Sequence, residues 1–270
     1  MSKIIKSPLR YPGGKSRAIE QIHAHLPLHI QEYREPFIGG GSVFLSVKGI
    51  FNKHIQRYWI NDIHSDLTCF WKGLRDDPTA LLERLWHYKH HYDDGRTLYN
   101  YFKDERNTQT DLARAVRFFV MNRITFSGVM DAGGYSEQAF QKRFTDSSIE
   151  RLERIIPILQ NTHITQFDYE TLLFAEGEQV FIFLDPPYYS ATKSRLYGKR
   201  GELHTMFDHE RFADAMQRCS HRWLITYDDS PMIRSLFSFA DISAWQLQYG
   251  MNNYKQASAA KGNELFIRNY

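Results

Sequence analysis

Runs of apolar residues separated by polar turns recur near both ends of the chain, and the clearest of them spans residues 180–184. These five apolar residues are followed at once by Asp185, Pro186 and Pro187. An unbroken apolar run indicates a strand buried on both faces of a sheet, and prolines end such a strand because they remove backbone donors. Further strands are predicted at residues 32–37, 58–62, 163–168, 221–227, 242–249 and 265–269.

The last two predicted strands are joined by residues 252–262, which carry no convincing crossover helix. Parallel neighbours need a crossover of a dozen or more residues, whereas antiparallel neighbours do not. We therefore expect the last two strands to pair antiparallel.

The middle of the chain, from residue 65 to about residue 159, has helical periodicity and no strand pattern. Its strongest helical segment is 111–123, in which apolar side chains form one stripe: Leu112, Ala115, Val116, Phe119 and Val120. Shorter helices are predicted at residues 17–25, 43–48 and 208–219. The whole pattern predicts an α/β fold, with a seven-stranded sheet, helices on both of its faces and a helical insertion.

The composition suits one α/β domain with an inserted subdomain, because 270 residues of which 42% are apolar can fill a core. No apolar segment follows Met1 and none reaches the length of a bilayer span, so we expect a cytoplasmic protein without membrane association. Cys69 and Cys219 are isolated, which excludes zinc and redox spacings and indicates a reducing compartment. The net charge of +3 is small, so a nucleic-acid site has to be a local patch.

Asp185 and Tyr188 follow the buried strand, and open α/β sheets bind ligands at the carboxyl ends of their strands. The exocyclic amine of adenine is a poor nucleophile because its lone pair is delocalised into the ring. The carboxylate of Asp185 and the carbonyl of Pro186 are able to accept its two N–H bonds, and Tyr188 is able to stack on a base taken out of the duplex. The alternative is a strand and a proline turn without chemistry.

A cofactor site is predicted where Gly39, Gly40 and Gly41 follow the strand at residues 32–37 and precede a helix. Glycines in this position let the backbone approach a ligand closely. About 20 residues later Asp62 ends the next strand, where it is placed to accept ribose hydroxyls.

An earlier glycine turn at residues 11–16 is not a Walker A loop, because Leu9 stands where such a loop needs its first glycine. Its backbone N–H groups and Lys15 suit a ligand carboxylate instead. A plain tight turn is the alternative.

Basic and histidine-rich segments bear on possible partners. Four cationic residues fall between positions 193 and 200 without an acidic neighbour, which favours phosphate contacts: Lys193, Arg195, Lys199 and Arg200. The glycine-rich segment 126–136 is either a surface turn or a probe that enters a DNA groove. His87, His90 and His91 share a helix face but lack a carboxylate or thiol partner, so we expect a solvated face and no metal.

In this order, the motifs resemble those of the Dam-type (D12 class) adenine-N6 DNA methyltransferases, and the likeness covers nearly the full chain. The resembling motifs are Tyr11-Pro12-Gly13-Gly14-Lys15, Glu35-Pro36-Phe37-Ile38-Gly39-Gly40-Gly41-Ser42, Asn61-Asp62 and Asp185-Pro186-Pro187-Tyr188. The resemblance implies a Rossmann-like methyltransferase sheet and S-adenosylmethionine as cofactor. It implies cofactor contacts by Tyr11, Lys15, Phe37, Gly39, Gly41, Ser42, Asp62, Asp168 and Asp185, and catalysis by Asp185, Pro186 and Tyr188.

The resemblance also assigns the helical insertion to target recognition. It implies a catalytic domain at residues 1–67 and 161–270, a target-recognition subdomain at residues 68–160, and double-stranded DNA as the partner. The predicted DNA contacts are Arg123, Tyr135, Lys142, Arg143, Lys193, Arg195, Lys199 and Arg200. Members that methylate GATC carry arginine and asparagine in a hairpin where this chain has Met130-Asp131-Ala132-Gly133-Gly134, so the resemblance does not extend to GATC specificity.

Together these features predict a monomeric enzyme that transfers a methyl group from S-adenosylmethionine to N6 of a flipped adenine in duplex DNA. A cognate restriction endonuclease is an open partner. The same amine chemistry leaves cytosine N4, RNA or a glutamine amide open as acceptors, and the fold alone leaves open a catalytically silent DNA-binding module.

Overall fold

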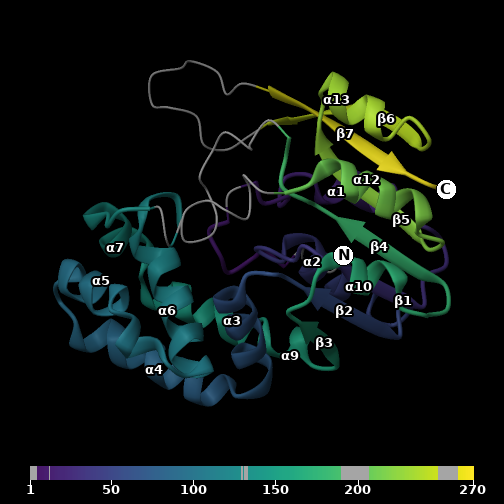
Figure 1. The fold of residues 1–270 in the computed structure, drawn as a ribbon. Coiled ribbons are helices and arrows are strands. Elements are labelled where there is room, and N and C mark those ends of the chain that lie inside the picture. Colours follow the sequence, from purple (N-terminus) through teal and green to yellow (C-terminus); the bar gives the residue numbers. More distant parts are fainter. Residues whose placement is uncertain (1–4, 12, 129, 131–132, 190–206, 249–260) are drawn as a thin grey trace.

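Across the part of the chain that the structure describes, seven strands form one sheet (Figure 1). The computed structural model describes residues 5–11, 13–128, 130, 133–189, 207–248 and 261–270. The strands are β1 (Glu32–Glu35), β2 (Arg57–Asn61), β3 (Thr162–Thr165), β4 (Val180–Leu184), β5 (Arg222–Asp228), β6 (Asp241–Gln248) and β7 (Lys261–Arg268). Their order across the sheet is β3-β2-β1-β4-β5-β7-β6, and each lies within a few residues of a strand predicted from the sequence.

Strands β3, β2, β1, β4 and β5 are parallel, and β7 runs antiparallel to both β5 and β6. The predicted antiparallel pairing of the last two strands is therefore confirmed. Strand β7 begins at Lys261 rather than at residue 265, so it includes Glu264. Because β2, β1 and β4 are parallel neighbours, their carboxyl ends lie side by side, and we call this rim of the sheet the carboxyl edge.

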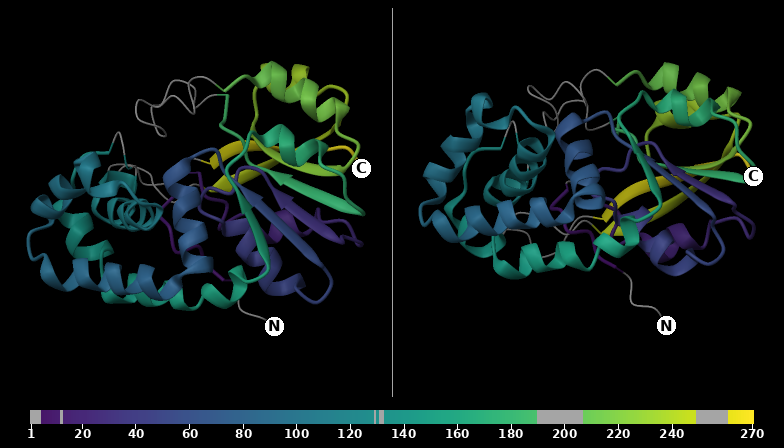
Figure 2. Two further views of the ribbon diagram at one scale, coloured as in Figure 1. Left: turned by 60° about the horizontal axis from the view of Figure 1, so that its bottom comes forward. Right: turned by 90° about the horizontal axis from the view of Figure 1, so that it is seen from below.

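Helices cover both faces of the sheet, as predicted (Figure 2). The buried cluster on one face includes residues of α1 (Ile19–His23) and α2 (Ser42–Phe51), and the cluster on the other includes residues of α10 (Tyr169–Phe174), α12 (His209–Arg218) and α13 (Pro231–Leu236). Successive residues of β4 alternate between the two clusters: Phe181 and Phe183 join the first, and Ile182 and Leu184 join the second. Strand β4 is thus buried on both faces.

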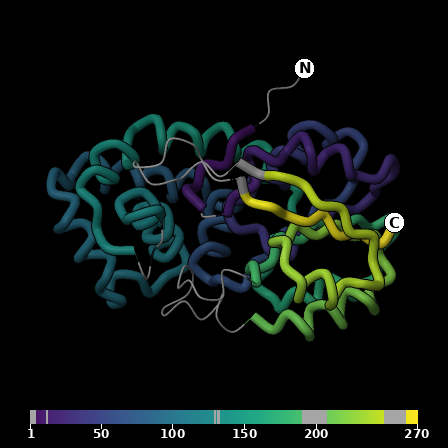
Figure 3. Tube along the Cα trace, turned by 90° about the horizontal axis from the view of Figure 1, so that it is seen from above, coloured from purple at the N-terminus to yellow at the C-terminus, as the bar shows by residue number. Residues whose placement is uncertain are grey.

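The segment between β2 and β3 forms a group of helices beside the sheet (Figure 3). It contains α3 (Ser65–Asp76), α4 (Pro78–His91), α5 (Gly95–Lys103), η1 (Glu105–Thr108), α6 (Asp111–Ile124), η2 (Phe126–Gly128), α7 (Glu137–Arg143), α8 (Asp146–Glu153) and α9 (Ile156–Leu159). Helix α6 contacts α3, α4, α5 and α7, which places it at the centre of this group. Residues 118–124 of α6 are all buried, whereas the sequence predicted a single buried stripe. Neighbours on every side of its last two turns account for the difference.

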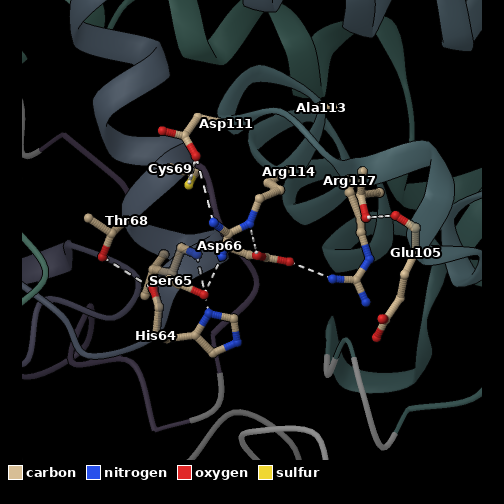
Figure 4. A network of polar contacts seen from close by, with 12 residues as sticks. His64, Ser65, Asp66, Thr68, Cys69, Glu105, Asp111, Ala113, Arg114 and Arg117 are labelled. Carbon is tan, nitrogen blue, oxygen red and sulfur yellow. Dashed lines mark hydrogen bonds and ion pairs between the residues drawn. The ribbon is translucent and has the colours of Figure 1, made fainter.

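A carboxylate at the start of α3 fastens this helix to α6 (Figure 4). Asp66 accepts hydrogen bonds from Arg114 Nε at 2.8 Å and from Arg117 Nη1, and Arg114 also donates to Ser65 Oγ. His64 caps the same end of α3 by accepting the backbone N–H of Leu67 at 3.2 Å. We call the contacts of Asp66 with the two arginines the Asp66 clamp.

A buried amide near the other end of α6 holds the N-terminal segment. Asn122 Oδ1 accepts the backbone N–H of Arg10 at 3.0 Å, and Asn122 Nδ2 donates to the carbonyl of Arg10 at 2.8 Å. The same Nδ2 donates to the carbonyl of Gly128 at 3.1 Å. These contacts, the Asn122 clamp, tie α6 to the chain segment that leads into Tyr11 and Lys15.

Within the described residues, no helix is long and apolar enough to cross a membrane. The same residues contain no cluster of three or more histidine, cysteine, aspartate or glutamate side chains that could hold a metal ion. His87, His90 and His91 are exposed on α4, as predicted.

We expect Asp66→Ala to destabilise the protein by about 1.5–3 kcal/mol, because it removes the shared acceptor of two arginines in a nearly buried position. Asp111→Ala is the matched control, since Asp111 lies 3.6 Å from the same Arg114 but its side chain is 86% exposed. That change should cost no more than about 1 kcal/mol. Urea denaturation measures both values, and equal losses would contradict a structural role for the Asp66 clamp.

Candidate active site

Three segments that the sequence marked for chemistry meet at the carboxyl edge. The glycine turn follows β1, Asp62 follows β2 and Asp185 follows β4, and these strands are adjacent in the sheet. The N-terminal segment lies across this edge, because Tyr11 packs on the glycine turn and Lys15 reaches Asp185. The site is therefore assembled from parts of the chain that are up to 170 residues apart.

Aromatic rings explain why the turn after β1 contains glycine. Gly39 and Gly41 have φ values of 45° and 69°, in the left-handed region that favours glycine. A Cβ atom on Gly39 would lie 2.7 Å from the ring of Tyr11, and one on Gly41 would lie 2.9 Å from the ring of Trp71. At these two positions it is the rings of Tyr11 and Trp71, and not a ligand, that approach the glycine backbone closely.

Asp62 is half-buried at the end of β2 and holds the turn in place. Its Oδ2 accepts the backbone N–H of Gly39 at 3.0 Å, and its Oδ1 accepts that of His64 at 3.0 Å. Burial raises the pKa of this carboxyl, and the two backbone bonds oppose that rise. A carboxylate offers about four acceptor positions, so Asp62 retains capacity for a ligand hydroxyl.

Asp185 forms an ion pair with Lys15 that contacts both carboxylate oxygens. The distances from Lys15 Nζ are 2.8 Å to Oδ1 and 2.9 Å to Oδ2, and Thr226 Oγ1 donates to Oδ1 at 2.9 Å. Lys15 is almost fully buried, whereas the Asp185 side chain is 22% exposed. Asp185 Oδ2 therefore has one partner among the described residues and remains accessible.

Tyr188 is engaged within the site by three contacts. Its hydroxyl donates to Glu264 Oε2 at 2.8 Å, its ring stacks on Tyr227 with centroids 5.9 Å apart, and Lys15 Nζ lies 4.7 Å from its centroid. A base stacked on Tyr188 would have to share the ring with these neighbours. Stacking of a base on Tyr188 stays a prediction.

Glu264 belongs to this site and was missed in the sequence. It is 1% exposed, and burial is the main cause that raises the pKa of its carboxyl to about 7. Lys15 lowers that pKa, whereas the charges of Asp185 and Asp228 raise it. The sequence predicts a strand that begins at residue 265, so Glu264 falls just before it. In the structure Glu264 lies inside the strand.

Sequence comparison identifies the family. A family model described as D12 class N6 adenine-specific DNA methyltransferase matches residues 11–251. The chain belongs to this family.

Three relatives of the methyltransferase are similar over most of their length. The chain is 27% identical over 251 residues to the DNA adenine methylase of Vibrio cholerae serotype O1, which covers 87% of this chain and 86% of that protein. It is 24% identical over 281 residues to the type II methyltransferase M1.LlaDCHI of Lactococcus lactis subsp. cremoris, covering 97% and 94%. It is 23% identical over 278 residues to the type II methyltransferase M.CviBI of Paramecium bursaria Chlorella virus NC1A, covering 98% and 100%.

Family membership confirms the predicted enzyme class. The protein is an adenine-specific DNA methyltransferase with DNA as its substrate and S-adenosylmethionine as its methyl donor. Cytosine N4, RNA and a glutamine amide, which the amine chemistry had left open as acceptors, have no support from this match.

The carboxylates at the carboxyl edge of the methyltransferase match the chemical groups of this cofactor. S-adenosylmethionine carries a ribose diol, a cationic sulfonium and an amino-acid group. Asp62 has acceptor positions left for the diol, and the Asp185 carboxylate has the charge that suits a cation. Gly13 has a φ of 74° and open space within 4 Å of an added Cβ, so the N-terminal turn has room beside it. Asp62 would hold the ribose.

Other residues predicted to bind the cofactor have partners of their own among the described residues. The Phe37 ring packs on Tyr169 at 5.6 Å, and Ser42 Oγ lies 3.0 Å from Ser16 Oγ. Asp168 is exposed, caps α10 and forms an ion pair with Arg211 at 3.2 Å. Strand β3 ends at Thr165, so Asp168 begins a helix and does not end the strand as predicted. Cofactor contacts by these residues stay predictions.

The predicted DNA contacts separate into three groups. Arg123, Lys142 and Arg143 line one hollow in the surface. Tyr135 is nearly buried, its hydroxyl donates to Glu137, and the guanidinium of Arg96 lies 4.4 Å from its ring centroid. Residues 193–200, which contain the other four predicted contacts, lie outside the described residues.

Asp62→Ala should weaken S-adenosylmethionine binding about 10- to 100-fold, because the ribose hydroxyls lose their acceptor. Asp62→Asn, which keeps one acceptor oxygen, should give a smaller loss. Isothermal titration calorimetry measures both affinities, with Asp76→Ala on the surface as the control. Unchanged affinity in a folded Asp62→Ala protein would remove Asp62 from the cofactor site.

Glu264→Gln should reduce the pH dependence of stability. The pKa of Glu264 rises to about 7 on folding, so the folded protein binds this proton more tightly than the unfolded chain. The resulting contribution to the free energy of unfolding is fully present below about pH 4.5 and is lost as the pH rises through 7. Wild-type protein should therefore lose more stability between pH 5.5 and pH 8 than the Glu264→Gln variant. Thermal unfolding at the two pH values tests this, and parallel losses in the two proteins would contradict a raised pKa.

Proposed function

We propose that this methyltransferase acts on an adenine that has left the DNA helix, and that Asp185 with the carbonyl of Pro186 receives its amine. The observation that carries the proposal is the placement of Asp185: its carboxylate is 22% exposed at the carboxyl edge, on the same rim as the candidate cofactor residue Asp62, with only strand β1 between their two strands. A base inside the duplex cannot bring N6 to the end of a strand, so the base must be extruded.

Asp185 would act by hydrogen bonding and by charge. Its Oδ2 accepts one N–H bond of the adenine amine and the Pro186 carbonyl accepts the other, which localises the lone pair on N6. S-adenosylmethionine, when bound, supplies a methyl group made electrophilic by its sulfonium. As N6 becomes positive, the carboxylate stabilises that charge, and afterwards its Oδ2 is placed to take the proton.

Lys15 is the positioning residue for this carboxylate. Its ammonium contacts both oxygens and also donates to the carbonyl of Gly13 at 3.0 Å, so its own place is fixed by the N-terminal turn. Thr226 holds Oδ1 from the neighbouring strand β5. Asp185 therefore meets a substrate in a preset orientation, which reduces the reorganisation needed during the reaction.

For target recognition we propose the helical segment 68–160, with residues 1–67 and 161–270 forming the catalytic domain. A hairpin in this segment is closed by an antiparallel bridge between Thr125 and Tyr135, and Phe126 N donates to the carbonyl of Gly134 at 3.0 Å. Phe126 lies at the base of this hairpin and is 62% exposed. This hairpin is the candidate for base readout, and phosphate contacts belong to the basic residues around it.

We further propose that the enzyme acts as a monomer on one adenine at a time. The candidate cofactor and catalytic residues meet at one edge of a single sheet, so one chain is sufficient to build the site, which supports this. Two of the relatives described above carry type II names, which makes a cognate restriction endonuclease a reasonable biological partner.

Asp185→Ala should lower the single-turnover rate of methyl transfer about 10²-fold or more while duplex DNA and S-adenosylmethionine still bind, because the acceptor and its charge are lost. Asp185→Asn should fall between wild type and Asp185→Ala, since its amide oxygen accepts a hydrogen bond without the charge. Rapid-quench measurement of N6-methyladenine gives these rates.

The control for both variants is Asp241→Asn, a surface aspartate at the start of β6 that pairs with Arg268. It should leave the rate unchanged. Near-normal transfer by Asp185→Ala, with binding intact, would refute the proposed role of Asp185.

A further inference from the structure

A hollow of about 470 Å³ lies between the N-terminal segment and the ends of α6, α7 and α8. Five cationic residues line it: Arg10, Arg123, Lys142, Arg143 and Arg151. Its other lining residues within the described chain are small, polar or aliphatic, and none of these is acidic or aromatic. We call this feature the basic hollow.

Arg123 is the most buried of the five cationic residues and lacks, within the described residues, the partners that a buried cation normally has. It is 4% exposed, and within the described residues its Nε has no hydrogen-bond partner. Burial, together with the neighbouring arginines, lowers the pKa of Arg123 to about 9. A buried cation without a counter-charge is unfavourable in the free protein, so this arrangement indicates an anion that arrives from outside.

Another arginine of this chain shows the contrast. Arg34 is also fully buried, but it pairs with Glu32 at 2.6 Å and donates to the carbonyls of Leu172, Ala175 and Glu176. Arg34 thus has a counter-charge, and each of its three nitrogens has a hydrogen-bond acceptor inside the protein. By contrast, the guanidinium of Arg123 lies 5.1 Å from the ring centroid of Phe119, in a cation–π contact.

We propose that the basic hollow binds one backbone phosphate of the DNA substrate, with Arg123 as its buried anchor and Arg10, Arg143 and Arg151 around it. A guanidinium presents donors in a fork that matches two phosphate oxygens. Among the lining residues that the structure describes, none is an aromatic side chain on which a base could stack, so this lining suits a phosphate rather than a nucleoside. This inference rests on the proposed mode of DNA binding.

The position of the hollow favours a DNA phosphate over a free anion. Lys142 and Arg143 lie in the last turn of the helix that follows the hairpin closed at Thr125 and Tyr135. Arg10 directly precedes Tyr11, and Arg10 Nη1 donates to the carbonyl of Thr125 at 3.2 Å. A phosphate seated here would contact both the segment that leads to the carboxyl edge and the base of the hairpin.

The experiment replaces single phosphates of a short duplex by neutral methylphosphonates and measures equilibrium binding to wild type and to Arg151→Gln. For wild type, one position should weaken binding about 10- to 100-fold. Arg151→Gln should bind unmodified DNA more weakly, lower the slope of log affinity against log salt by about 0.9, and lose much of its sensitivity at that one position. Arg154→Gln, an exposed arginine just beyond the hollow, should keep the wild-type profile.

Arg123→Met provides a second measurement that does not depend on affinity alone. Because it replaces an unpaired buried cation by an apolar side chain of similar length, the free protein should melt about 2–4 °C higher than wild type. The same change should weaken DNA binding. A variant that is more stable but binds less tightly is the signature of a charge kept for a ligand.

Two results would overturn the proposal. One is a methylphosphonate profile that is the same in wild type and Arg151→Gln. The other is stabilisation of wild type by inorganic phosphate, absent in Arg123→Met, without coupling to any DNA position, which would assign the hollow to a free anion. Because binding is measured without methyl transfer, neither result affects the role of Asp185.

Discussion

The fastening of α6 at both ends is the constraint on which the arrangement of this molecule depends. The Asp66 clamp joins the helix to the start of α3, a few residues after Asp62, and the Asn122 clamp joins it to the segment just before Tyr11. Both joints are polar and directional, so they fix orientation as well as distance. The helices between β2 and β3, which we propose for target recognition, are therefore fixed relative to the segments that carry Asp62 and Tyr11.

The candidate active site is built from charges that lie close together and share one cation. Lys15 pairs with Asp185 and lies over Tyr188, whose hydroxyl is bonded to Glu264. One ammonium thus lies near two carboxyls. Burial is the main cause that raises the pKa of Glu264 to about 7, and the charge of Lys15 opposes that rise. Arg123 shows the opposite solution, in which several cations meet without an acid. At the first place there are more carboxyls than cations, and at the second there are more cations than carboxyls. Both places are ones where we propose that DNA or cofactor binds.

The sequence was sufficient for features that depend on neighbouring residues. The apolar run at 180–184, the prolines after it and the glycines after β1 are local signals, and the strands, the helices on both faces and the antiparallel last pair follow from them. Arg151 carried no such signal, and the charge of Glu264 in front of an apolar run did not reveal its place in the site, because the neighbours of both residues come from distant parts of the chain. The complete burial of residues 118–124 in α6 also depends on packing by other helices, and periodicity along one helix cannot reveal it.

The place of β7 has a consequence for how the protein is made. This strand lies between β5 and β6 although it follows both in the chain, and β6 pairs with no other strand. During translation the sheet stays open at this point until β7 has left the ribosome, and until then Tyr188 has no Glu264 behind it. The helices between β2 and β3 contact mainly one another, and they precede β4 to β7 in the chain, so they are able to pack earlier. A nascent chain thus contains the helices between β2 and β3 before Glu264 has joined the candidate active site, and that site is complete only after β7 has paired with β5.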